Sequence, residues 1–143
     1  MNNFKKLLAL LTVYQYNLRV LHWKISGLDF DDKHSLFGGY YEEFDGFIDK
    51  VSELSMQLGN DPISFNEVHS ICDNMEENVI ICQGSTNYSN IDALKMIGTM
   101  FEQLITVIES CQEGSPSDIQ SELDDIKQYL RLESRYKNRR RLS

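Results

Sequence analysis

The sequence predicts an all-α protein: a four-helix bundle with a short extra helix in a long crossover between the second and third main helices. Apolar residues recur at spacings of three and four through most of the 143 residues, which is the period of an amphipathic helix. Only two prolines occur, and proline breaks helix interiors. We find no useful strand-like alternation, and the length fits one domain over residues 1–143.

The first two long helices are predicted over Asn3–Ile25 and over about residues 31–58. Gly27 ends the first, because glycine accepts the left-handed conformation that follows many helices. Asp31 or Asp32 is expected to cap the exposed N–H groups at the start of the second. The short link between them makes these two helices antiparallel.

The second half of the chain contains the crossover and two further helices. A short helix is expected within Ile63–Cys72, whereas Asp73–Tyr88 fits either more crossover or the start of the third helix. That helix is predicted to begin near Ser89, with an acid three residues later as in a capping box. The fourth opens in Ser115–Asp118 with its proline at the first helical position. A long middle connection permits the up-down-down-up order of ferritin-like bundles.

Charge is segregated along the chain. The formal net charge is -8, and an acidic body repels nucleic acid on average. The basic C-terminal tail, about residues 131–143, is the exception. It is read either as a solvated helix end or as a flexible arm that neutralises DNA phosphates. The candidate DNA-binding residues are Arg135, Lys137, Arg139, Arg140 and Arg141.

Cysteine usage and hydropathy bear on the compartment. The three cysteines are an odd number with no CxxC pair, which favours buried thiols in a reducing compartment over a disulfide framework. No apolar run approaches the roughly 20 residues that a membrane span needs. We therefore expect a cytoplasmic protein without a membrane partner, located at the nucleoid if it binds DNA.

Ligand-type residues gather in the first two helices. His22 lies among leucines, where a histidine is either a packing residue or a ligand. The second helix carries an acidic ridge that is either a solvated face or partly buried at an interface, where it would need a cation. Carboxylate plus imidazole suits iron, manganese or zinc. The Glu-x-x-His motifs of a di-iron site within one subunit are absent. The ridge comprises Glu42, Asp45, Asp49 and Glu53.

These residues carry a recognisable pattern. An LHW-x-x-x-G segment includes His22; His34 follows twelve residues later, Asp49 fifteen after that, and Glu53 four further on. The pattern resembles the Dps family of mini-ferritins, strongly over residues 18–65 and more weakly through the last two helices.

The resemblance implies a function and a site. It implies a homo-oligomeric shell, usually a dodecamer, that oxidises Fe(II) with hydrogen peroxide as the preferred oxidant and stores ferric iron. His22 and His34 of one subunit would face Asp49 and Glu53 of its neighbour at a twofold interface. These four residues are the expected catalytic and metal-binding set. Trp23 would be an electron donor or an interface residue.

Two departures and two alternatives accompany the resemblance. Many relatives have an acid where this chain has Gly38, so the second iron position is expected to be weak or filled by water. Arg131 stands where relatives often have an aromatic residue. The main alternative is a structural or DNA-compacting shell with a weak or silent metal site. A further one is a zinc- or manganese-binding assembly without redox turnover.

Overall fold

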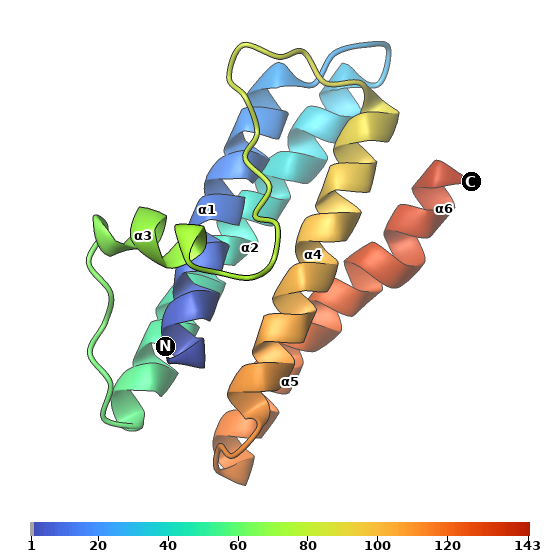
Figure 1. Cartoon of the computed structure of the whole chain (residues 1–143). Coiled ribbons are helices and arrows are strands. Elements are labelled where there is room, and N and C mark those ends of the chain that lie inside the picture. Colours follow the sequence, from blue (N-terminus) through green and yellow to red (C-terminus); the bar gives the residue numbers. More distant parts are fainter. Residues whose placement is uncertain (1) are drawn as a thin grey trace.

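The computed structural model describes residues 2–143, and four long helical rods dominate it (Figure 1). Within these residues no strand forms apart from one isolated bridge, so the all-α prediction is confirmed. The last rod is one continuous helical run that changes from α-helix to π-helix and back. The elements are α1 (Asn3–Lys24), α2 (Phe30–Gln57), α3 (Glu67–Asp73), α4 (Asn90–Gln112), α5 (Ser117–Arg131), the π-helix η1 (Leu132–Lys137) and α6 (Asn138–Leu142).

The apolar stripes of the four rods meet in one core. Leu7, Leu11, Phe37, Phe44 and Phe101 are all fully buried, and the rings of Phe44 and Phe101 lie 5.6 Å apart between α2 and α4. Burying one such side chain stabilises the fold by about 1.5–3 kcal/mol. The helical period therefore determines which face of each rod is covered.

The observed start of α4 agrees with the sequence prediction, whereas those of α2 and α5 differ from it. Ser89 caps α4, since its Oγ accepts from the backbone N–H of Asp92 at 3.1 Å. The predicted cap of α2 was wrong, because the helix begins earlier, at Phe30, and Asp31 and Asp32 lie within its first turn. There the positive end of the helix dipole stabilises their negative charges. Pro116 occupies the N-cap position of α5 rather than its first helical position.

The segment that the sequence left open, residues 73–88, extends the crossover (Figure 1). Its path is held by Asn17, a buried side chain of α1 that donates to the carbonyl of Ile80 at 2.7 Å and accepts from the N–H of Cys82 at 3.0 Å. Further on, Tyr88 forms a bridge with Ile25. These contacts bring the start of α4 to the end of α1.

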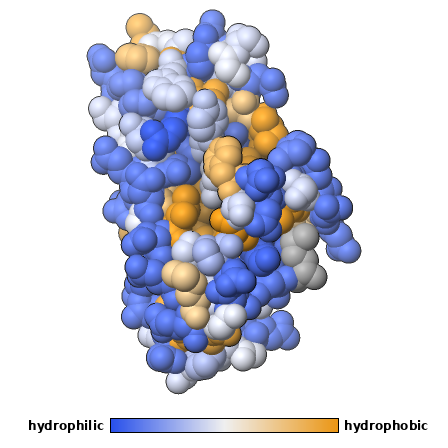
Figure 2. Space-filling model, turned by 90° about the vertical axis from the view of Figure 1, so that its left-hand side faces the viewer, coloured by the Kyte–Doolittle hydropathy of each residue, from blue (hydrophilic) through white to orange (hydrophobic). Residues whose placement is uncertain are grey.

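The crossover also creates an apolar face. Apolar residues gather near the middle of the side that carries α3 (Figure 2). A pocket of about 350 Å³ lies there, with Val68 and Cys72 of α3 in its wall. Phe65 and Ile81 at its edge are 85% and 57% exposed.

None of the helices in residues 2–143 combines the length and the apolar character needed to cross a bilayer.

Candidate metal centre

Two histidines form a reciprocal pair where α1 ends and α2 begins. His22 Nδ1 lies 2.5 Å from the carbonyl oxygen of His34, and His34 Nδ1 lies 2.7 Å from the carbonyl oxygen of His22. The rings stack with centroids 3.6 Å apart and planes 15° from parallel. The loop of residues 25–29 makes this possible, because it folds the first turns of α2 back against the last turn of α1.

This geometry determines which ring nitrogens are free. A carbonyl oxygen only accepts hydrogen bonds, so each Nδ1 must carry the proton that it donates. In the neutral ring the lone pair then belongs to Nε2, on the side away from the backbone. Metal-binding histidines are oriented in the same way, by a carbonyl or carboxylate that holds the other ring nitrogen. Both rings are half-buried, so they are held and still accessible.

Gly38 provides the space for the first of these rings. A Cβ added at position 38 would lie 3.1 Å from Cε1 and 3.3 Å from Nδ1 of His22. The departure from the Dps pattern therefore has a structural counterpart: the glycine is in contact with the imidazole. A side chain at this position would require the His22 ring to move by a few tenths of an ångström.

The two acids of the predicted set are far from the histidines in a single chain. Asp49 and Glu53 are exposed on α2. Asp49 lies fifteen residues after His34, so about 22 Å separates them along the axis at 1.5 Å per residue. Within residues 2–143 no cluster of three or more His, Cys, Asp or Glu side chains is arranged to hold a metal. Within one chain the predicted set is therefore divided into a nitrogen half-site, His22 and His34, and a carboxylate half-site, Asp49 and Glu53.

On α2, His34 and the two acids lie within about 100° of one another around the helix axis. At 100° per residue, Asp49 lies about 60° and Glu53 about 100° around the α2 axis from His34. Asp45, which lies between His34 and Asp49 along α2, accepts a hydrogen bond from Gln15 of α1. A second α2 packed antiparallel on this surface would bring each nitrogen half-site toward a carboxylate half-site, as in any isologous contact.

The aromatic residues near the histidines differ in their contacts. Tyr41 is half-buried, and its ring lies edge-on to His22 with centroids 5.4 Å apart. Trp23 is 55% exposed, and its ring lies edge-on to that of Tyr16 with centroids 6.2 Å apart. The sequence analysis assigned a role to Trp23 and none to Tyr41. Tyr41 follows His34 by seven residues, or two helical turns, so both lie on one face of α2.

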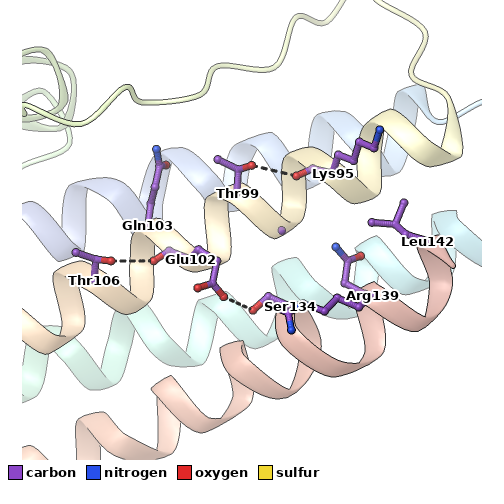
Figure 3. Close-up of a pocket in the computed structure, with 10 residues that line it drawn as sticks. Lys95, Thr99, Glu102, Gln103, Thr106, Ser134, Arg139 and Leu142 are labelled. Atoms are coloured by element: carbon purple, nitrogen blue, oxygen red, sulfur yellow. Dashed lines mark hydrogen bonds between the residues drawn. The ribbon is translucent and has the colours of Figure 1, made fainter.

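The basic tail is an ordered helix, which corrects the hypothesis of a flexible arm. Arg135 pairs with Glu102 of α4 at 3.0 Å, and this guanidinium lowers the pKa of the Glu102 carboxyl. Figure 3 shows Glu102 directed toward Ser134, whose hydroxyl donates to it at 2.9 Å. The tail is therefore held against α4 along an open groove of about 730 Å³.

A second acid holds the rest of the tail. Glu133 is buried and accepts from the hydroxyl of Tyr40 at 2.8 Å, and it pairs with Lys137 at 2.8 Å and with Arg141 at 3.7 Å. Burial and the Glu133 charge raise the pKa of the Tyr40 phenol. Of the five candidate DNA-binding residues, three are thus paired with acids. Arg139 and Arg140 are exposed and form no ion pair with the described residues.

The cysteines are buried, as the sequence predicted, and the third histidine is exposed. Cys72, Cys82 and Cys111 are buried free thiols, and burial raises the pKa of Cys82 to about 11 and that of Cys111 to about 12. His69 is exposed and pairs with Asp73, four residues on, at 3.0 Å.

Comparisons with known proteins show which proteins the chain is similar to. The chain is 38% identical over 92 residues to the DNA protection during starvation protein of Porphyromonas gingivalis, a match that covers 64% of this chain and 58% of that relative. The chain therefore matches less than two thirds of that relative's length. No family model matches the chain.

Solved structures agree over nearly the whole chain. A Dps protein from Bacillus brevis has a TM-score of 0.85 at 19% identity, covering 99% of this chain and 93% of that one. The DPS protein of Vibrio cholerae, described as a member of a broad superfamily of ferritin-like diiron-carboxylate proteins, has a TM-score of 0.81 at 20% identity, covering 99% and 87%. Motif, sequence match and fold agree: the chain is similar to Dps proteins in sequence and has the ferritin-like fold of their solved structures.

Proposed function

We propose that this protein is a ferroxidase and iron-storage shell. Subunits assemble, as a dodecamer by analogy with the family, and Fe(II) is bound and oxidised by hydrogen peroxide between them. His22 and His34 of one subunit supply imidazole nitrogens, and Asp49 and Glu53 of a neighbour supply carboxylates. The observation that carries the proposal is the reciprocal histidine pair, in which both Nδ1 atoms contact backbone carbonyl oxygens, so that the Nε2 lone pair of each neutral ring is left for a ligand.

The donor set suits the chemistry. Two carboxylates hold a hard cation and favour the ferric product over the ferrous reactant, while two imidazoles provide borderline nitrogen ligands. The backbone carbonyls that accept from the two Nδ1 atoms hold the rings in place before the substrate ion arrives. Because each half-site alone has only two ligands, oxidation at this centre requires assembly.

Mixed shells test the shared site directly. One variant carries His22→Ala and His34→Ala, and the other carries Asp49→Asn and Glu53→Gln. Each pure shell should lack peroxide-driven Fe(II) oxidation above the protein-free rate. In co-expressed shells half of the twofold pairs are mixed, and each mixed pair keeps one intact site, so about a quarter of the wild-type activity should return.

Three other results would count against the proposal. Activity in either pure shell would place oxidation elsewhere, and intact mixed shells without recovery would refute the sharing of ligands. If the wild-type shell binds metal but does not accelerate oxidation, a zinc- or manganese-binding assembly is the better description. Size-exclusion chromatography of every preparation verifies that shells have formed.

A second candidate function, DNA binding, is favoured by the two unpaired arginines of α6. Many copies on one shell would add their phosphate contacts. Replacing Arg139 and Arg140 with alanine should abolish gel retardation of duplex DNA at low salt. Replacing Arg135, which is already paired with Glu102, should change it less. Unchanged retardation in the double variant would refute a role for α6 and leave the structural or DNA-compacting reading without this support.

A further inference from the structure

The imidazole of His34 is stacked against a ring on each of its two faces. The His22 ring covers one face, with centroids 3.6 Å apart and planes 15° from parallel. The Phe30 ring is stacked on His34 as well, with centroids 5.0 Å apart and planes 22° from parallel. Because His22 leaves no room for a second ring on its own side, Phe30 covers the opposite face. The His34 imidazole is therefore accessible only along its edge.

The turn between α1 and α2 places Phe30 in this position. Gly27 has a φ of 118°, a backbone conformation that favours glycine, and its carbonyl accepts from the N–H of Phe30 at 3.2 Å. Phe30 thereby becomes the first residue of α2. His34 follows it by four residues, so the two side chains are neighbours on one face of the helix.

Phe30 contributes less to the core than the other phenylalanines of α2. Its side chain is 39% exposed, whereas Phe37 and Phe44 are fully buried. Core packing therefore does not account for a large apolar ring at this position. The contact that distinguishes it is the one with His34.

A ring that is covered on both faces cannot turn over freely. Half a turn about the Cβ–Cγ bond of His34 would exchange Nε2 with Cε1, and the imidazole would pass through the space that His22 and Phe30 occupy. The same rotation would break the hydrogen bond from His34 Nδ1 to the carbonyl of His22, which is 2.7 Å long. The stack and the hydrogen bond together keep Nε2 in one position, and a ligand that is already oriented loses less freedom when it binds.

We propose that Phe30 is a positioning residue of the metal centre, whose ring keeps His34 Nε2 directed toward the metal ion. This inference rests on the proposed role of His34 as a ligand. Phe30 does not contact the ion and supplies no donor atom. Its effect is on affinity: without the flat ring the imidazole samples more orientations, which binding must then restrict. The rate of oxidation after binding is unchanged, because the donor set is the same.

The test uses three variants of the assembled protein. Phe30→Leu keeps an apolar side chain and removes the flat ring, whereas Phe30→Tyr keeps the ring. The matched control is Phe65→Leu, the same substitution at a phenylalanine of the crossover that is 85% exposed. Calorimetric titration with zinc measures affinity without redox chemistry. Peroxide-driven oxidation is then measured against Fe(II) concentration, which separates KM from kcat, and size-exclusion chromatography verifies every shell.

In Phe30→Leu the Kd for zinc and the KM for Fe(II) should each rise about two- to tenfold, the range expected for one aromatic stack. The kcat should stay within about twofold, because bound metal has the same ligands. Phe30→Tyr and Phe65→Leu should keep the wild-type values. A role in folding alone would instead lower shell yield or kcat and leave the zinc affinity of intact shells unchanged.

The inference and the ferroxidase proposal can fail separately. Wild-type zinc affinity and KM in Phe30→Leu, or an equal loss in Phe30→Tyr or in Phe65→Leu, would overturn the role of Phe30 and leave iron oxidation standing. If zinc affinity depends on Phe30 as expected but the wild-type shell does not accelerate iron oxidation, the positioning role stands and the ferroxidase proposal fails. A wild-type shell that binds neither zinc nor iron would overturn both.

Discussion

Two adjacent glycines of α2 provide a matched pair that tests how the histidine centre is built. Gly38 and Gly39 both lie inside the helix, where alanine is favoured over glycine by about 1 kcal/mol. Nothing lies within 4 Å of a Cβ added at Gly39, whereas one added at Gly38 would meet the His22 ring at 3.1 Å. Gly39→Ala should therefore stabilise the protein by about 1 kcal/mol.

Gly38→Ala gains the same helical preference, but it weakens the contacts between His22 and His34. The ring must move by a few tenths of an ångström, which weakens its hydrogen bond to the His34 carbonyl, and such a bond contributes about 1 kcal/mol. The stacked pair is disturbed as well, so the two variants should differ by about 1–2 kcal/mol. For a chain of this length the difference corresponds to about 3–6 °C in Tm.

The assay is thermal unfolding followed by circular dichroism, at one fixed subunit concentration because assembly contributes to stability. Calorimetric titration with zinc should also show weaker binding to Gly38→Ala than to Gly39→Ala. Equal Tm shifts together with equal zinc affinity would refute the reasoning, because they would show that the His22 ring does not depend on the missing side chain at position 38.

Three further predictions concern the tail and the thiols. Tyr40→Phe should destabilise the protein by about 1–3 kcal/mol in urea unfolding, because buried Glu133 loses a hydrogen-bond donor. Glu102 has a pKa lowered by Arg135, so it contributes stability above its ordinary pKa of 4.5 and loses this contribution as the pH falls below that value. The pH dependence of Tm should therefore be shallower in Glu102→Gln; an identical slope would contradict the pairing. Cys111, with its pKa raised to about 12, should resist a thiol-specific reagent at mildly alkaline pH until denaturant is added; rapid native labelling would contradict its burial.

The order and faces of the helices were determined by the sequence itself. A period of three to four apolar residues specifies which side of a helix is buried, and this local property placed Phe37 and Phe44 in the core. The Ser89 cap was predictable for the same reason, since a cap acts within one turn. The His22, His34, Asp49 and Glu53 spacing was also visible in the sequence, and their role as one metal site stays a prediction.

Contacts between distant segments were decided by tertiary structure alone. Whether residues 73–88 would be helix or crossover depended on Asn17, a side chain on another element that holds their backbone. The tail became an ordered helix because Glu102 and Glu133 neutralise part of its charge. Gly38 looked like a lost ligand in the sequence, and only packing revealed that the His22 ring lies against it. The physical reason is common to all three: periodicity reports which face a residue occupies, while a partner far along the chain is selected by the fold.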